Sequence, residues 1–419
     1  MPEPASTAAP PVRVGRRPKP SRHRRKRAVS ITLSNVAIDI IRSMKNLLGG
    51  EDEPVGPENP PTSAIPVSET SSKVDAYAQY KTGSMPAISL TSNFRCPERG
   101  EEFEVYVRTL ERDFKAYDPD FVIERWLGSG GFCDVFFVPE VKIPGKGRRR
   151  AVLRVLRPTK YRTTDPELNN QNIRLFLTEM GYNLYLSSQN VPNIVKMYDF
   201  GFFGRAPGQG RGGEGPRHLY MIMEHVDGED VSVRWRKKPS DEKELMKRVV
   251  LVNLIAGIVG DLHFRGIIHC DIKPTNVLIR GNSPYLTDFG SARWMHVKDD
   301  VGGMHMIMPG TQTYMSYEQL QGDIYRLDQR TDIFSLAVLA CYAFTGTNPF
   351  QARTDIDIKN EPLGLAALSM VDPEVPKIPY RSGDKLREIL LECLSRDPEQ
   401  RPSSMVAFQH RLNSWILES

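Results

Sequence analysis

A run of polar residues in the middle of the chain has the types and spacing for phosphate chemistry. It spans His269 to Asn276 and reads HCDIKPTN, and a DFG triplet begins at Asp288, twelve residues after Asn276. A carboxylate can orient an attacking hydroxyl, an ammonium can neutralise a transferred phosphoryl group, and oxygen ligands can hold a divalent metal. We therefore assign Asp271 and Lys273 as catalytic residues, and Asn276 and Asp288 as metal ligands.

A glycine-rich run lies about 140 residues before Asp271, and its pattern indicates a strand, a turn and a second strand. Because glycine has no Cβ, its backbone N–H groups can approach phosphates closely. Alone, such a run more often marks an ordinary hairpin turn, but its position ahead of the polar run favours a phosphate-binding loop. The residues assigned to it are Gly128, Ser129, Gly130, Gly131, Phe132, Cys133 and Val135.

Together these motifs resemble the glycine-rich, catalytic and magnesium loops of eukaryotic-type Ser/Thr protein kinases. The resemblance covers roughly residues 121 to 417, or 297 of 419 residues. It implies a two-lobed α+β fold, with a small, mostly antiparallel-sheet N-lobe at 121–226 and a larger helical C-lobe at 227–417. It also implies ATP and Mg²⁺ as cofactors and transfer of the γ-phosphoryl group to protein substrates. Lys273, two residues past Asp271, is typical of members that act on Ser and Thr.

The resemblance assigns a phosphate cation and its partner. Arg154 lies on a predicted strand over 151–156 and would hold the α- and β-phosphates. Glu179, on a predicted helix over 173–187, would pair with it. A solvated helix face remains the alternative role for Glu179.

The adenine pocket is assigned in the same way. The predicted strand 219–224 ends at a hinge, where Met223 would line the back of the pocket. The backbone of Glu224 and Val226 would bond the purine edge. Val152 and Leu278 complete the set of residues expected to contact the nucleotide.

The resemblance assigns structural roles, and not catalytic ones, to three further residues. Glu318 ends the segment that begins at Gly310, and Arg401 is its expected ion-pair partner. Asp332, on a predicted apolar helix over 332–345, is expected to brace the backbone of the catalytic loop.

Arg154 is a departure from the family, which has Lys at this position. Arginine keeps the charge, but its planar fork is longer and less adaptable than an ammonium group. Lys142 and Lys146 are near in the sequence, but both are expected in the loop before the predicted strand 151–156. A pseudokinase, acting as a nucleotide-binding or scaffold module, therefore stays open as the alternative function. A small-molecule kinase is a third reading, although the segment from Gly310 to Glu318 and its partner Arg401 argue against it.

Two further departures concern regulation. Cys270 stands before Asp271, where many members have the Arg that pairs with a phosphorylated loop. No Ser, Thr or Tyr occurs from Ala292 to Pro309, so the usual phosphate acceptor is absent together with its receptor. We therefore expect activity that does not depend on phosphorylation of this segment.

Composition agrees with a globular domain that carries a long extension. The chain has 419 residues and 40% hydrophobic content, and no apolar run reaches the ~18 residues of a membrane span. Its five cysteines are scattered and lack metal-binding spacing. No secretory signal is apparent, and a reducing, cytoplasmic setting is the expected location.

Residues 1–95 are predicted to form a basic, Pro- and Ser-rich disordered tail, followed by a lead-in helix within 96–120. An amphipathic helix is expected near 34–48. Such a tail suits an anionic membrane surface, an acidic protein or nucleic acid, with nuclear or membrane-surface association as further locations. The alternative is a leader whose helix docks on its own kinase domain. The glycine-rich stretch 201–217 is expected to be a flexible insertion between strands.

Overall fold

The computed structural model describes residues 100–129, 133–157, 166–203, 218–295, 312–323, 325–356, 363–380 and 382–418. Its helices are α3 (Gly100–Phe114), α5 (Pro166–Ser188), α6 (Val231–Arg234), α7 (Glu242–Phe264), α8 (Tyr317–Leu320), α9 (Gln329–Thr345), α10 (Leu363–Met370), α11 (Gly383–Cys393) and α12 (Met405–Glu418). Short 3-10 helices are η1 (Pro274–Asn276), η2 (Gln351–Asp355) and η3 (Pro398–Gln400). The strands are β1 (Arg125–Ser129), β2 (Cys133–Ile143), β3 (Gly147–Leu156), β4 (Met197–Phe203), β5 (His218–Glu224), β6 (Glu229–Asp230), β7 (Ile267–Ile268), β8 (Val277–Arg280), β9 (Ser283–Leu286) and β10 (Arg293–Trp294).

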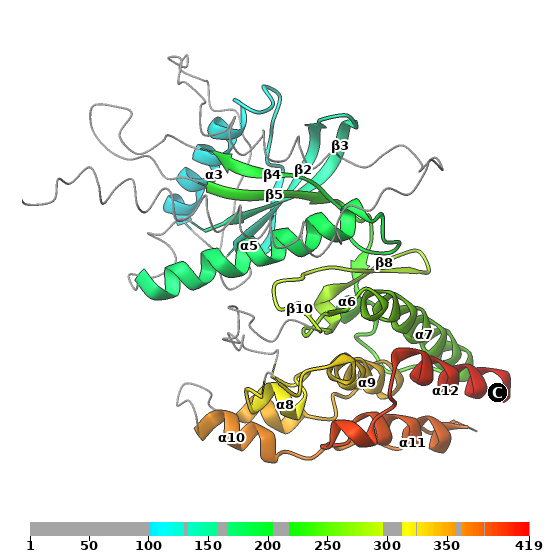
Figure 1. The fold of residues 1–419 in the computed structure, drawn as a ribbon. Helices are drawn as coiled ribbons and strands as arrows, with labels where there is room; N and C mark the ends of the chain where they lie inside the picture. The colour runs from blue at the N-terminus through cyan, green and yellow to red at the C-terminus, as the bar shows by residue number, and fades with distance from the viewer. Residues whose placement is uncertain are drawn as a thin grey trace, which may run out of the picture. The chain divides into compact units, whose positions relative to one another are not determined.

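The N-lobe is built on a five-stranded antiparallel sheet with the order β1-β2-β3-β5-β4 (Figure 1). Strand β3 shows why the sheet has two different faces, because successive side chains of a strand point to opposite sides. Ala151, Leu153 and Val155 are fully buried. Val152 and Arg154, which alternate with them, are only partly buried. One face therefore belongs to the lobe's core, and the other presents Arg154 to the site.

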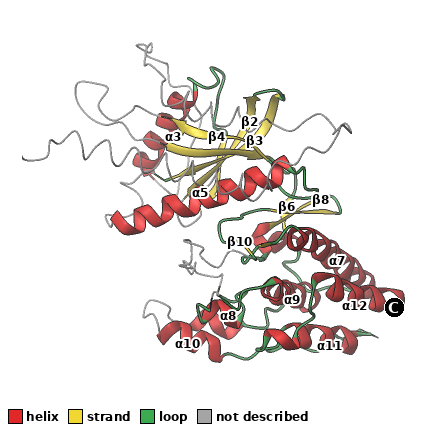
Figure 2. Cartoon of the chain, viewed as in Figure 1, coloured by secondary structure: helices red, strands yellow, loops and turns green. Residues whose placement is uncertain are grey.

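Helix α3 covers the core face of this sheet. Phe103, Val107, Leu110 and Phe114 recur at the three- and four-residue spacing of one helical face, and all are buried. They pack in one cluster with Leu153 and other residues of the sheet strands. Figure 2 shows α3 beside the strands of this sheet. Helix α3 is therefore a structural part of the N-lobe.

Helix α5 lies against the opposite face. The ion pair between Arg154 of β3 and Glu179 of α5 fixes this side, because Arg154 points away from the face that α3 covers. Buried Phe176 and Leu177 anchor the middle of α5, and its C-terminal half packs near β4. The sheet thus separates α3 from α5.

The C-lobe is mainly helical and has its own hydrophobic core. Helix α9 is buried over almost its whole surface, from Thr331 to Phe344, which is typical of a central core helix. Helix α7 packs beside it, and α12 packs on α7. None of the helices in the described ranges has the length and apolar character needed to cross a membrane.

The predicted α+β arrangement, an antiparallel-sheet N-lobe followed by a helical C-lobe, is confirmed by this architecture. Two local expectations were wrong. Lys142 was expected in the loop before β3 but lies within β2, opposite Arg148. The stretch from Gly201 to Phe203 was assigned to an insertion but continues β4, because it pairs in register with β5. The basic tail, its helix near 34–48 and residues 204–217 lie outside the described residues.

Candidate active site

The segment between β7 and η1 is the expected catalytic loop, and a buried carboxylate holds its backbone. Asp332 of α9 is fully buried, and it accepts hydrogen bonds from the N–H groups of His269 and Cys270, both at 2.8 Å. Cys270 has a positive φ of 62°, a conformation that costs energy for a residue with a side chain. The Gln319 side-chain amide donates to the Cys270 carbonyl at 2.8 Å. These bonds hold the strained residue just before Asp271.

Asp271 is surrounded by donors on one side only. Its Oδ2 atom accepts from Lys273 Nζ at 2.8 Å and from Asn276 Nδ2 at 3.0 Å. Asn276 Nδ2 also donates to the Asp271 carbonyl at 2.8 Å. Oδ1 of Asp271 is buried and accepts no hydrogen bond from the described residues. A buried acceptor without a donor costs about 1–3 kcal/mol, so Oδ1 is suited to receive a substrate hydroxyl.

The two acidic groups of the site have opposite pKa shifts. Burial raises the pKa of Asp271 above its usual range, and the neighbouring Lys273 opposes this shift. Burial acts in the same direction on Asp288, but Arg154 and Lys273 outweigh it and lower the pKa of Asp288. Asp288 is therefore ionised at neutral pH, which is the form required of a metal ligand.

Arg154 links both lobes through its planar fork. Nη1 forms an ion pair with Glu179, whose side chain is fully buried. Nη2 lies 3.6 Å from Oδ1 of Asp288 and 3.6 Å from the sulfur of Cys133. Burial alone lowers the pKa of Arg154, but the adjacent Glu179 carboxylate raises it well above the ordinary value, so Arg154 is charged. Burial raises the pKa of Glu179 to about 8, although Arg154 opposes this shift.

Lys142 and Lys146, the two lysines before β3, do not contact Glu179 or Asp288. The ammonium of Lys146 lies 5.1 Å from the centre of the Tyr198 ring. Lys142 is exposed and stands opposite Arg148 in the β2–β3 ladder. Among these three basic side chains, only Arg154 contacts Glu179 and Asp288.

The residues expected to contact the nucleotide outside the glycine turn come from four strands and the hinge. Val135, Val152 and Leu278 are half-buried, and Val135 lies opposite Arg154 in the β2–β3 ladder. Val152 pairs with Met223, which is buried, across β3 and β5. Val226, just after β5, is also buried.

One of the two backbone groups of Glu224 that could bond a purine is already hydrogen-bonded within the N-lobe. Its N–H already donates to the Lys196 carbonyl at 2.7 Å. A purine contact from Glu224 must therefore use its carbonyl, while Val226 supplies an N–H.

The phosphate-loop candidates are described only at its two ends. Gly128 and Ser129 close β1, and Ser129 pairs with Asp134 of β2. Cys133 opens β2 and is buried beside Arg154. Gly130, Gly131 and Phe132 lie outside the described residues.

Asn276 and Asp288 suit a magnesium ion by their chemistry. No cluster of three or more His, Cys, Asp or Glu side chains that could enclose a metal occurs in the described ranges. Mg²⁺ does not require one, because it is usually bound through one or two protein oxygens together with water and phosphate oxygens. Asp288 contributes an ionised carboxylate and Asn276 an amide oxygen, which is a fitting donor set.

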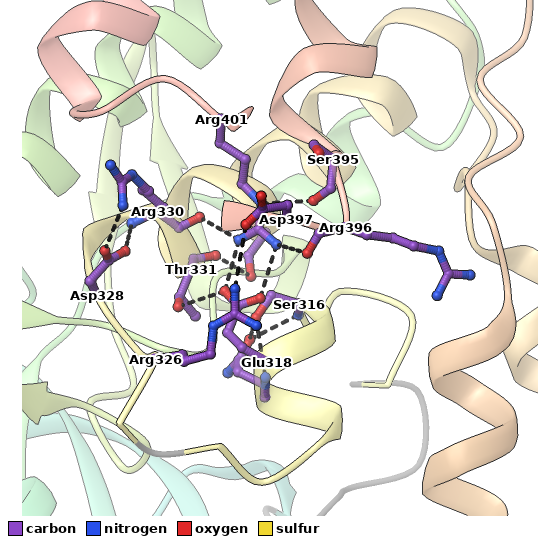
Figure 3. Close-up of polar contacts among 12 residues, drawn as sticks. Ser316, Glu318, Arg326, Asp328, Arg330, Thr331, Ser395, Arg396, Asp397 and Arg401 are labelled. Atoms are coloured by element: carbon purple, nitrogen blue, oxygen red, sulfur yellow. Dashed lines mark hydrogen bonds and ion pairs between the residues drawn. The ribbon is translucent and has the colours of Figure 1, made fainter. Parts of the chain in front are cut away.

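A buried ion pair holds the end of the segment that follows residue 311. Arg401 donates two hydrogen bonds to Glu318, at 2.7 and 2.9 Å, and Thr331 donates to the same carboxylate at 2.9 Å (Figure 3). Arg401 also reaches the backbone carbonyl of Ser395 at 2.9 Å. Burial raises the pKa of Glu318, but the bonds from Arg401 outweigh this and lower it. The satisfied pair ties α8 to α9 and η3.

Gln319 is a functional position that the sequence analysis missed. It forms a capping box with Ser316 at the start of α8, and it also holds the Cys270 carbonyl. The signal was the Ser-x-x-Gln spacing, which is a sequence signature of a helix start. The spacing could reveal the cap but not the contact with a loop 49 residues away.

Residues 121–413 match the family model described as protein kinase domain. The chain is also similar to curated serine/threonine-protein kinases. It is 27% identical over 304 residues to pkn3 of Myxococcus xanthus, covering 70% of this chain and 49% of the relative. It is 28% identical over 297 residues to PknF of Mycobacterium tuberculosis (strain ATCC 25618 / H37Rv), covering 70% and 55%. It is 27% identical over 296 residues to ULK3 of Xenopus laevis, covering 70% and 54%. The chain thus spans about half the length of these relatives.

Proposed function

Because this chain belongs to the protein kinase family, we propose that it is an active enzyme that transfers the γ-phosphoryl group of MgATP to Ser or Thr residues of proteins. Family membership implies ATP and a divalent metal in general terms. The observation that carries the proposal is the geometry of Asp271. Its Oδ2 atom is held by Lys273 and Asn276, while its buried Oδ1 has no donor among the described residues.

Each side chain has a role that follows from its position. Asp271 Oδ1 accepts the hydrogen bond of the substrate hydroxyl and orients its oxygen toward the γ-phosphorus. Lys273, 2.8 Å from Asp271 Oδ2, supplies positive charge where the transferred group becomes more negative. The new P–O bond forms at the hydroxyl oxygen, the bond to the β–γ bridging oxygen breaks, and the hydroxyl proton passes to Asp271. Bound metal would supply charge neutralisation of the phosphates, held by Asn276 and Asp288.

Arg154 favours the enzyme over the pseudokinase alternative. The arginine keeps the ion pair with Glu179 and places its second nitrogen 3.6 Å from Asp288. The longer fork therefore reaches both carboxylates and places positive charge beside Asp288, the expected metal ligand next to the phosphates. No catalytic group among Asp271, Lys273, Asn276 and Asp288 is replaced.

Ser and Thr are the proposed acceptors for two reasons. Lys273 stands two residues past Asp271, in the pattern typical of members that act on Ser and Thr. The relatives named above are themselves called serine/threonine-protein kinases. The basic tail is proposed to bind an anionic membrane surface, an acidic protein or nucleic acid.

The test is transfer from labelled ATP to a generic Ser/Thr protein substrate with Mg²⁺, comparing the wild type with Asp271→Asn. Asn keeps the size of the side chain but removes the carboxylate, so transfer is expected to be lost while nucleotide binding is retained. Asp288→Ala is expected to weaken Mg²⁺-dependent nucleotide binding as well. Equal residual activity in the wild type and Asp271→Asn would refute the enzyme proposal.

A further inference from the structure

Arg353 is a buried cation that lies outside the machinery described so far. It belongs to η2, shortly after α9, and its side chain is 0% exposed. No carboxylate of the described residues is among the charges that act on it. Its Nε and Nη2 atoms are buried without a hydrogen-bond partner in the described part of the chain.

The remaining nitrogen of Arg353 holds the backbone that leads into α8. Nη1 donates to the Met315 carbonyl at 2.7 Å and to the Gln312 carbonyl at 3.2 Å. Ser335 of α9 donates to the intervening Tyr314 carbonyl at 2.9 Å. We call residues 312–316 the shelf segment. Three of its five carbonyls are thus held by side chains from α9 and η2.

The guanidinium group of Arg353 packs against two aromatic rings. Its central carbon lies 3.8 Å from the centre of the Phe350 ring and 5.1 Å from that of Tyr317. Tyr317 is in turn fixed by its hydroxyl, which donates to the Val371 carbonyl at 2.9 Å. Burial lowers the pKa of Arg353 to about 10, so the side chain is still charged at neutral pH. Cation–π attraction offsets part of the cost of burying this charge.

The shelf segment is connected by hydrogen bonds to the catalytic loop. The Ser316 N–H donates to the Gln319 side-chain oxygen at 3.0 Å. The amide nitrogen of the same Gln319 donates to the Cys270 carbonyl at 2.8 Å. A continuous path therefore runs from Arg353 through Met315, Ser316 and Gln319 to the residue before Asp271.

A purely structural role accounts poorly for Arg353. Within the described residues this charge has no carboxylate partner and two of its nitrogens have no close hydrogen-bond partner, which is unfavourable. Replacing buried charges by apolar residues of similar volume is often neutral for stability. Both hydrogen bonds from this side chain to backbone carbonyls go to the shelf segment, and Tyr317, just after that segment, also interacts with the guanidinium. The cost of burying the Arg353 charge is therefore best explained by its hold on the backbone of the shelf segment.

We propose that Arg353 is a positioning residue for the protein substrate, which fixes the shelf segment relative to Asp271 so that the acceptor hydroxyl reaches the carboxylate. This inference rests on the proposed function, since it concerns the protein substrate of the same reaction. It assigns Arg353 to binding of the protein substrate and not to binding of the nucleotide.

The test compares Arg353→Met and Arg353→Lys with a matched control, Arg248→Met. Arg248 is also buried and donates to one backbone carbonyl, that of Ala343 at 2.9 Å, but it lies on α7 and also pairs with Glu244 at 3.1 Å. The readouts are KM for a peptide substrate, KM for ATP, and amide hydrogen exchange of residues 312–316. The lysine variant keeps the charge and serves as the second variant if Arg353→Met does not fold.

Arg353→Met is expected to raise the peptide KM by about tenfold, the loss typical of one charge-assisted hydrogen bond, and to speed exchange in the shelf segment. KM for ATP is expected to stay unchanged, and Arg353→Lys is expected to lie between wild type and Arg353→Met. Arg248→Met is expected to leave both KM values and the shelf exchange at wild-type levels.

The proposal is overturned if Arg353→Met matches the wild type in peptide KM and shelf exchange, or if Arg248→Met changes them equally. A wild type without any transfer activity would instead refute the proposed function. In that case amide hydrogen exchange of residues 312–316 is the remaining test of the positioning role. Faster exchange in Arg353→Met than in Arg248→Met supports that role.

Discussion

Replacing Arg154 with Ala tests whether an arginine fork acts as the phosphate cation. Arg154 pairs with the fully buried Glu179 carboxylate, and its second nitrogen lies 3.6 Å from Asp288. Removing one partner of a buried ion pair costs about 3–5 kcal/mol of stability, because the other charge is left without a counter-ion. We expect a loss of this order in the free energy of unfolding. We also expect kcat/KM to fall at least about tenfold, or about 1.4 kcal/mol of transition-state stabilisation.

Two further variants separate stability from catalysis. In Arg154→Ala combined with Glu179→Gln, the neutral amide needs no counter-ion, so much of the lost stability is expected to return while activity stays low. Arg154→Lys keeps the charge in a more compact group, and its activity is expected to equal or exceed that of the wild type. The assays are denaturant unfolding, and transfer from labelled ATP to a generic Ser/Thr substrate at matched concentrations of folded protein.

Wild-type activity in folded Arg154→Ala would refute this reasoning. Another cation would then hold the phosphates, and Lys142 and Lys146 would be the residues to replace next. Recovery of activity in the double variant would also contradict it, because the defect would then come from the unpaired Glu179 and not from the missing cation.

Four other predictions concern the site, the phosphate-acceptor segment, the tail and α3. The acid limb of the kcat/KM profile is expected above pH 3.8, since burial raises the pKa of Asp271 and only its carboxylate form accepts the proton. Lys273→Met is expected to move that limb to higher pH, because Lys273 lowers this pKa, and an unmoved limb would count against the coupling. Activity is expected to survive phosphatase treatment, and a loss that tracks dephosphorylation of the Ser291–Thr313 peptide in mass spectrometry would show otherwise. Deleting residues 1–50 is expected to leave thermal unfolding unchanged and to abolish salt-sensitive binding to anionic vesicles, heparin or an acidic protein. Deletion through residue 116 removes α3 and is expected to lower the unfolding midpoint, because five large side chains of the N-lobe core are lost with it; equal midpoints for the two truncations would contradict this role of α3.

The grouping of Asp271, Lys273 and Asn276 could be predicted from the sequence because these residues are neighbours in the chain. Asp271, Lys273 and Asn276 lie within six residues, and short loop geometry brings Lys273 and Asn276 to the same carboxylate oxygen. The strands beside the loop were predictable for the same reason, since alternation and apolar runs are local signals. The family resemblance, which rests on such local motifs, agrees with the protein kinase domain match over residues 121–413.

The limits of prediction appear where contacts join residues that are distant in the chain. Nothing in the sequence near Gln319 indicates that it holds the Cys270 carbonyl, and nothing near Arg353 indicates that it holds Gln312, 41 residues away. Lys142 was misplaced because the pairing of β2 with β3, with its irregularity between Val138 and Val141, decides where the hairpin turns.

The sequence by itself determined the chemical groups, their order and the antiparallel-sheet and helical lobes. Local spacing encodes these features, because periodicity and turn residues act over a few positions. The tertiary structure decided which carboxylates the Arg154 fork joins, which oxygen of Asp271 remains open, and that α3 completes the N-lobe core. These outcomes depend on the packing of elements far apart in the chain, and the energy of a buried charge or an apolar face is set by the partner that packing brings to it.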